Sequence, residues 1–286
     1  HLDAALRCLA GGGILSFTST DVSALCDRRY RHVAKRHYGV KLNYKRNSEN
    51  YHDISLRVIL ATVAKSAARQ DKGIKILTAV SLDHFFLIQI QVIRGTKEAD
   101  RTASSAEWMT KEGEGPLWSG KLGDSTFLTN LIKHAKNEKV VLSSLKNRKR
   151  VVHLLGILSK ENIGDLSSIR SSEIQSKIIN LNFIISKYKF EKVPKKLNQT
   201  LTNEIAKKYG IESASVTHLD PCSIRTIVSR SAVSEAVFCV VKKMGEGGDE
   251  EKKEIGRKYN RKRNERAILL SGSIFVIVLL HIFRKG

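Results

Sequence analysis

Three consecutive glycines followed by a short apolar segment constrain the fold of this chain more than any other feature. Apolar residues recur at helical spacing over 1–10, so a helix is predicted to end at Gly11–Gly13. Residues 14–18 then form a predicted strand, which is followed by Thr20 and Asp21. In open α/β sheets, ligands bind at the carboxyl ends of the strands. The sequence therefore predicts an α/β sheet with a functional loop after this strand.

A second helix and two strands are predicted further along the same domain. The apolar stripe from Tyr51 through Ala68 predicts a long helix, and Gly73 ends that region. Strands are predicted over 74–81 and 85–93, with a tight connection between them. The more apolar face of the second strand consists of Phe86, Ile88, Ile90 and Val92. Two adjacent strands after a helix are typical of the antiparallel hairpin that ends a methyltransferase-type α/β sheet, although fold class alone does not fix function.

Composition divides the chain into a domain over 1–95, a polar linker over 96–114 and a second domain over 115–241. The second domain is predicted to begin at the punctuating sequence Gly115–Gly120. Helices are predicted around 127–132 and over 151–158, 171–185 and 201–209, and a strand over 213–218. The order of helix, helix, strand and basic turn predicts an α+β, winged-helix-like domain. Such units dock on nucleic acid in some proteins and serve only as packing modules in others.

The chain of 286 residues carries a formal net charge of +22, which favours a polyanionic partner, either nucleic acid or an anionic membrane face. A mixed-charge linker is predicted over 242–266, and an apolar segment follows over 267–283. That segment is about the minimum length for crossing a bilayer, so Ala267 to Phe283 is a candidate membrane anchor. A buried terminal helix and an artefact of a gene model are the competing interpretations.

The sequence contains no complete catalytic constellation. Gly11–Gly13 precede a strand instead of following one, so they are not a phosphate-binding loop. The four cysteines lack metal-ligand or disulfide spacing, which indicates free thiols in a reducing compartment and no metal site. The first residues do not have the pattern of a signal peptide, so none is expected. Because the chain starts at His1 inside a predicted helix, we expect the N-terminal part of a longer protein to be missing.

Several motifs resemble, in order, the tRNA (guanine-26-N2)-dimethyltransferase family, called Trm1. The resemblance runs from Leu2 to about Thr226 and does not cover the tail beyond Lys242. The motifs are Phe17-Thr18-Ser19-Thr20-Asp21, Ala24-Leu25-Cys26, Tyr38-Gly39, His52-Asp53, Leu56-Arg57, Ile59-Leu60, Phe85-Phe86-Leu87, Gly115-Pro116-Leu117-Trp118-Ser119-Gly120 and Thr217-His218-Leu219-Asp220-Pro221-Cys222-Ser223-Ile224-Arg225-Thr226.

The resemblance implies the C-terminal half of a class I, Rossmann-like methyltransferase sheet, followed by a domain particular to the family. It implies transfer of methyl groups from S-adenosylmethionine to N2 of guanine 26 in tRNA, forming mono- and dimethylguanosine. The family's cofactor loops and catalytic Asp-Pro-aromatic-Gly motif lie upstream, so no catalytic residue is expected on this chain. A monomer is expected, in the nucleus or alternatively in a mitochondrion, with membrane association through the tail as a further alternative.

What remains on this chain is the rim of the site. The candidates near the substrate base are Thr20, Asp21, Cys26, His52, Asp53 and Arg57. The candidates for contacting tRNA are Arg28, Arg29, Lys35, Arg36, Lys41, Lys45, Arg46, His218 and Arg225. For the basic run around Arg28, a solvated helix face is the competing interpretation. For His218, a structural role near a turn competes with tRNA binding.

Two interpretations stay open for Asp21: it accepts a hydrogen bond from the target guanine, or it caps the next helix. Asp53 stands where the family usually has Glu, and it either contacts substrate or holds the loop. The chain departs further from the family at Val216, where Arg is usual, and at Ser223, where Gly is usual. Residues 96–114 contain no cysteine, so the zinc-type pair often found there is not expected.

Two other functions compete with the enzyme. In the first, the chain is a non-catalytic tRNA-binding relative, as the missing upstream motifs and the altered signatures suggest. In the second, it is a basic protein tethered to a membrane by its apolar tail. If the chain is the enzyme or the tRNA-binding relative, tRNA binding should weaken steeply with added salt.

Overall fold

The structure is a computed structural model that describes residues 1–43, 50–82, 84–110, 113–136, 148–163, 177–187, 197–210, 214–219 and 222–245. Lys45, Arg46 and the predicted anchor Ala267 to Phe283 therefore lie outside the described residues, as does most of the predicted linker 242–266. None of the helices within these ranges combines the length and apolar character that crossing a bilayer requires.

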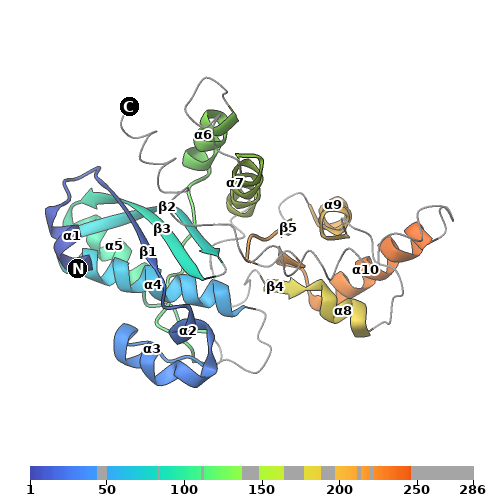
Figure 1. Cartoon of the computed structure of the whole chain (residues 1–286), viewed down its shortest axis with the longest axis horizontal. Helices are drawn as coiled ribbons and strands as arrows, with labels where there is room; N and C mark the ends of the chain where they lie inside the picture. The colour runs from blue at the N-terminus through green and yellow to red at the C-terminus, as the bar shows by residue number, and fades with distance from the viewer. Residues whose placement is uncertain are drawn as a thin grey trace.

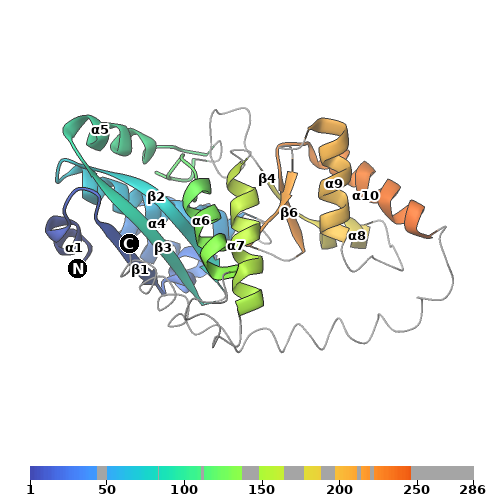
Figure 2. The same cartoon turned by 90° about the horizontal axis from the view of Figure 1, so that it is seen from above.

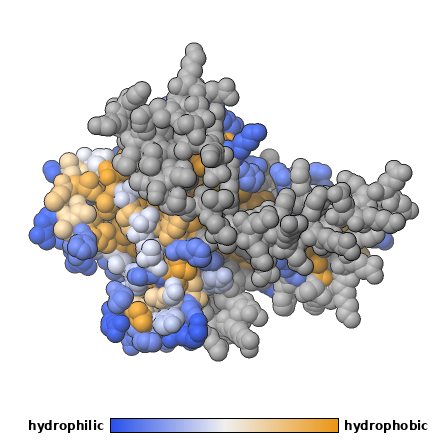
Figure 3. Space-filling model, viewed as in Figure 1, coloured by the Kyte–Doolittle hydropathy of each residue, from blue (hydrophilic) through white to orange (hydrophobic). Residues whose placement is uncertain are grey.

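The first unit is organised around a three-stranded sheet in the order β1-β3-β2. Its strands are β1 (Ile14–Ser19), β2 (Lys72–Leu82) and β3 (Phe85–Arg94). The central strand β3 is antiparallel to both neighbours, so β1 and β2 run parallel to each other. The predicted antiparallel hairpin is confirmed. Within the described ranges β1 pairs on one side only, and hydrophobic side chains are visible over this part of the sheet in Figure 3.

The sheet is packed on two faces by helices (Figures 1 and 2). One face is covered by the long helix α4 (Tyr51–Ala68) with α1 (Leu2–Cys8) and α5 (Thr96–Ser105) nearby. The apolar face predicted for β3 is buried in this core. The other face packs against α6 (Ser125–Lys136) and α7 (Arg148–Ile163), where Val80 and Leu87 join a separate core. A period-2 strand pattern thus places its side chains in two different cores.

Small helical elements follow β1. They are α2 (Val22–Cys26), the 3₁₀ turn η1 (Arg28–Tyr30) and α3 (Arg31–Tyr38), which ends at Gly39 in the left-handed conformation. Leu25 and Ala34 anchor α2 and α3 in the core shared with α4. The loop after β1 is therefore held in a defined place beside the first turn of α4.

The structure corrects the predicted linker 96–114, because most of it is helix α5 packed on β2 and α4. Ala99 and Thr102 are buried, and the Thr102 hydroxyl accepts a hydrogen bond from the Ile74 amide at 3.1 Å. The sequence Gly115–Gly120 also differs from its predicted role, since Leu117 and Trp118 pack into the core of the first unit and do not begin the second. The helix was not predicted because its sequence is mostly polar and only one narrow face of small residues is buried.

The contact between β2 and α5 yields a matched pair of glycine substitutions. A Cβ at Gly73 would lie 2.7 Å from the Glu98 carbonyl oxygen, whereas a Cβ at Gly156 within α7 meets nothing within 4 Å. We expect Gly73→Ala to lower the free energy of unfolding by about 1–3 kcal/mol, because α5 must shift. Gly156→Ala should raise it by about 0.5–1 kcal/mol by favouring helix. Urea unfolding measures both, and equal effects at the two sites would contradict the packing.

The second unit is a small three-stranded sheet with its own core. Its strands are β4 (Lys177–Asn180), β5 (Ala214–Val216) and β6 (Ser223–Thr226), in the antiparallel order β4-β6-β5. Its helices are α8 (Leu181–Lys187), α9 (Leu197–Tyr209) and α10 (Arg230–Gly245). The predicted helix 201–209 is confirmed, and the strand predicted over 213–218 is found over the three residues of β5.

Two predictions in this unit are corrected. The stretch predicted as one helix over 171–185 contains a strand first, because Ile178 and Ile179 pair with β6 before α8 begins. β-branched residues favour that pairing when a partner strand is available. The start of the predicted charged linker 242–266 is helical instead, since α10 continues to Gly245.

Candidate functional site

The parallel strands β1 and β2 end at the same edge of the sheet, and the candidate site is the rim formed there. Thr20 and Asp21 follow β1, Ser81 lies near the end of β2, and α4 begins at Tyr51. Thr20 is exposed, and Asp21 is partly buried. The structure therefore brings the predicted Asp21, Cys26 and His52 to one edge.

Asp21 holds α3 against α2. The Tyr38 hydroxyl donates a hydrogen bond to Asp21 Oδ2 at 2.5 Å. Burial, together with this hydrogen bond and the Asp21 charge, raises the pKa of Tyr38 above its ordinary value. Asp21 occupies the cap position of α2, but its side chain makes no capping hydrogen bond, so the side-chain cap interpretation is wrong. Its role toward a guanine stays a prediction.

A second polar cluster joins α2, α4 and β2. His52 Nδ1 lies 2.9 Å from the Ser81 hydroxyl oxygen and 3.8 Å from Cys26 Sγ, and Cys26 Sγ lies 3.3 Å from the Ser55 hydroxyl oxygen. The Tyr51 and His52 rings are 4.3 Å apart between centroids. These contacts fix His52 at the carboxyl edge of the sheet. Burial raises the pKa of the Cys26 thiol to about 11, so it is a neutral thiol near pH 7.

The chemical state of Cys26 is directly testable. Because Cys26 is protonated and half-buried while Cys8 and Cys239 are exposed, we expect a maleimide to label Cys8 and Cys239 first. At pH 7.5 the rate at Cys26 should be at least about tenfold lower than at Cys8. Peptide mass spectrometry over a time course measures the three rates. Labelling of Cys26 as fast as Cys8 would contradict the placement.

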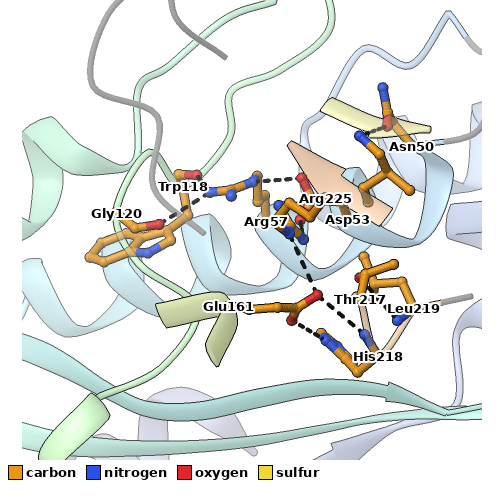
Figure 4. Close-up of polar contacts among 11 residues, drawn as sticks. Asn50, Asp53, Arg57, Trp118, Gly120, Glu161, Thr217, His218, Leu219 and Arg225 are labelled. Atoms are coloured by element: carbon orange, nitrogen blue, oxygen red, sulfur yellow. Dashed lines mark hydrogen bonds and ion pairs between the residues drawn. The ribbon is translucent and has the colours of Figure 1, made fainter. Parts of the chain in front are cut away.

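Asp53 and Arg57 belong to a buried polar network (Figure 4). Arg57 Nε donates to Asp53 Oδ2 at 3.1 Å, and Arg57 Nη1 donates to the carbonyl oxygens of Trp118 and Gly120 at 2.8 and 3.1 Å. The Arg57 side chain is 1% exposed. The structure therefore contradicts a substrate role for Arg57 and favours the structural interpretation of Asp53.

His218 and Arg225 are likewise not surface residues, so their predicted contacts with tRNA are wrong. Both side chains are 0% exposed. Arg225 Nη2 donates to Asp53 Oδ1 at 2.8 Å, and His218 Nδ1 lies 2.6 Å from Glu161 Oε2. Burial alone would raise the pKa values of Asp53 and Glu161, but neighbouring positive groups outweigh burial and lower both. The two carboxylates are therefore ionised at neutral pH.

The remaining basic candidates lie on the surface beside the rim. Lys35 and Arg36 are exposed on α3, and Lys41 is exposed just after it. Figure 3 shows hydrophilic side chains gathered at the bottom of the view, where Figure 1 places α3. Arg29 is exposed but is bound to Asp27 at 2.6 Å. The Arg28 side chain, Lys45 and Arg46 lie outside what the structure describes.

Sequence reasoning missed Ser55, Ser81 and Glu161, which complete these clusters. Ser81 is the last polar residue of a strand whose carboxyl end lies at the same edge of the sheet as that of β1, so strand position was an available signal. Glu161 lies in a helix with no motif, and nothing in the sequence pairs it with residues 57 positions later. Across the described ranges no group of three or more His, Cys, Asp or Glu residues is arranged to hold a metal ion.

Comparisons with known proteins find similarity to tRNA guanine-N2 dimethyltransferases. A family model for N2,N2-dimethylguanosine tRNA methyltransferase matches residues 1–113. Over 109 residues the chain is 42% identical to a human protein named tRNA (guanine(27)-N(2))-dimethyltransferase, covering 38% of this chain and 14% of that protein. It is 27% identical over 253 residues to the tRNA (guanine(26)-N(2))-dimethyltransferase of Thermococcus kodakarensis, covering 82% of this chain and 60% of that protein.

A solved structure shares the fold. The complex of Trm1 from Pyrococcus horikoshii with S-adenosyl-L-methionine matches with a TM-score of 0.64 and 23% identity, over 82% of this chain and 62% of the other. The match confirms an α/β methyltransferase fold for this chain. The chain spans only part of each relative, from 14% of the human protein to 60% of the Thermococcus protein.

Proposed function

We propose that this chain is a member of the Trm1 family and that it methylates, or is part of a protein that methylates, N2 of a guanine in tRNA with S-adenosylmethionine as methyl donor. The observation that carries the proposal is the family match over residues 1–113, which contain the whole rim from β1 through β3. The relatives that match over 109 and over 253 residues are both named for this reaction.

The rim chemistry suits this reaction. An exocyclic amine on a guanine ring is a poor nucleophile because its lone pair is delocalised, so it needs an acceptor beside it and close positioning. S-adenosylmethionine supplies the electrophilic methyl group when bound. On this chain the Asp21 carboxylate is the acceptor placed at the carboxyl edge, and Tyr38 orients it. We assign none of the described residues to the cofactor itself.

The proposal also has to state which guanine of the tRNA is methylated. Sequence motifs point to guanine 26, as in the Thermococcus relative, whereas the mammalian relatives with 42% identity over 109 residues are named for guanine 27. The higher identity to the relatives named for guanine 27 makes position 27 the alternative. Mapping the modified nucleotide by mass spectrometry of nuclease fragments distinguishes the two positions.

Methyl transfer from labelled S-adenosylmethionine to unmodified tRNA tests the proposal. The chain is assayed beside a version carrying whatever coding sequence precedes His1 in its transcript. Incorporation of label into guanine N2 by either protein supports the enzyme. Salt-sensitive tRNA binding without transfer by either protein would overturn it in favour of a non-catalytic binding relative.

We also propose that the second unit is winged-helix-like and contacts tRNA. The succession β4, α8, α9, β5 and β6, with the sheet order β4-β6-β5, supports the first part. Exposed Lys207 and Lys208 at the end of α9, beside the exposed Tyr209, support the second.

Location in the nucleus, or alternatively in a mitochondrion, stays a prediction that a fluorescent fusion protein tests. A membrane tether is an alternative that cell fractionation with and without 267–286 tests.

A further inference from the structure

The first turn of α4 is a place where the two units of the chain meet. Asn50 Oδ1, at the cap position of α4, accepts a hydrogen bond from the Ile178 amide of β4 at 3.2 Å. One turn later, Asp53 Oδ1 accepts from Arg225 of β6 at 2.8 Å. These contacts link positions 128 and 172 residues apart in the sequence. Figure 4 shows them converging on one end of the helix.

His52 lies in the same turn, between the two contacts. Its ring is fixed to Ser81 at the carboxyl end of β2 and therefore belongs to the rim. A single helical turn thus carries a rim side chain and two attachments to the second unit. Any rotation of the second unit relative to the sheet acts on this turn.

The attachment is a buried chain of alternating charges. It runs from Arg57 through Asp53 and Arg225 to Glu161, where Arg225 Nε lies 3.6 Å from Glu161 Oε1. Glu161 also binds His218, accepting from its backbone amide at 3.2 Å. The side chains of Arg57, Arg225 and Glu161 are 1%, 0% and 2% exposed, and that of Asp53 is 14% exposed.

From this geometry we propose that Asp53, Arg225 and Glu161 are positioning residues that fix the second unit at one orientation relative to the rim, so that both units contact one tRNA together. The tRNA part of this statement rests on the proposed function. Replacing a buried ion pair by apolar side chains often leaves stability unchanged, but removing one partner leaves a buried charge unpaired. All the buried charges are paired in very few arrangements of the two units. The network therefore contributes a fixed orientation of the second unit more than it contributes stability.

Two surfaces held rigidly at the right separation bind one long ligand more tightly than two loosely joined surfaces. The second contact then occurs at a high effective concentration. A transfer RNA is long enough to span separate surfaces, and its phosphates attract basic faces on both. We call the contacts of Asp53, Arg225 and Glu161 the joint. Loosening the joint should weaken tRNA binding and leave the rim chemistry itself unchanged.

The test compares Asp53→Asn with Asp124→Asn. Asp124 also forms an ion pair, with Lys75 at 2.9 Å, and caps α6 through the Phe127 amide, but both partners lie outside the second unit. Glu161→Gln is a second, milder variant that keeps the shape of the side chain. All are measured below their melting temperatures, which controls for simple loss of stability.

Spin labels on the exposed Cys8 of α1 and Cys239 of α10 report the orientation, in a Cys26→Ser, Cys222→Ser background of the full chain. We expect a narrow distance distribution for the parent protein and for Asp124→Asn, and a clearly broader one for Asp53→Asn and Glu161→Gln. In parallel, Kd for unmodified tRNA should rise by about tenfold in the two joint variants and less than about twofold in Asp124→Asn.

An unchanged distance distribution in both joint variants, or an equal rise of Kd in Asp124→Asn, would overturn the proposal. Where methyl transfer is measurable, KM for tRNA should rise with kcat retained, whereas a fall in kcat alone at unchanged KM would also overturn it. If even the parent protein transfers no methyl group, the proposed reaction fails, but the distance and binding measurements still decide the role of the joint.

Discussion

Replacing Arg57 by leucine should lower the free energy of unfolding by about 3–5 kcal/mol, because the variant leaves a buried carboxylate with one partner fewer. Arg57 is 1% exposed and makes an ion pair with Asp53 within α4. It also donates to the carbonyl oxygens of Trp118 and Gly120, which places that segment against the helix. Leucine fills part of the space but supplies no donor for either carbonyl.

Urea unfolding followed by circular dichroism measures this loss. Arg69→Leu is the matched control. Arg69 lies at the other end of α4 and pairs with Asp3 on the surface. Surface pairs of this kind contribute little, so this variant should unfold close to the parent. If Arg57→Leu and Arg69→Leu lose similar stability, the buried network does not hold the fold as the structure indicates.

Local patterns in the sequence identified the parts of the fold that depend on near neighbours. The hairpin of β2 and β3 was predictable because alternating apolar residues follow a glycine-ended helix and are separated by a tight connection. Asp21 was predictable from the short polar motif after the first strand, whereas His52 was identified through the family resemblance. These signals depend on residues only a few positions apart.

Contacts between distant residues were beyond such reasoning. Arg225 lies in a motif of the family resemblance, but its burial cannot be inferred from a motif or from its charge alone. Its partner Asp53 lies 172 positions earlier, and Glu161 lies in a helix without a motif. The helix α5 was missed for a related reason, since its small buried residues Ala99 and Thr102 acquire a partner only when β2 lies beneath them.

With Arg225 and His218 buried, the exposed basic face of α3 becomes the surface expected to bind tRNA. Lys35→Glu combined with Arg36→Glu should raise Kd for unmodified tRNA by about 10- to 100-fold near 0.1 M salt, because two cations are lost and two anions gained. The slope of log K against log salt should fall by about 2 in magnitude if each side chain contacts one phosphate. Filter binding over 50–300 mM salt measures both quantities.

The matched control makes the same change of charge elsewhere. Lys133 and Lys136 are exposed at the end of α6, which Figure 1 places on the opposite side of the sheet from α3. Lys133→Glu with Lys136→Glu alters net charge equally, so it reports the contribution of overall electrostatic attraction. A loss confined to the α3 variant identifies a specific face beside the rim. Equal losses would mean that net charge alone attracts the tRNA, and α3 would then have no special part in placing a guanine at Asp21.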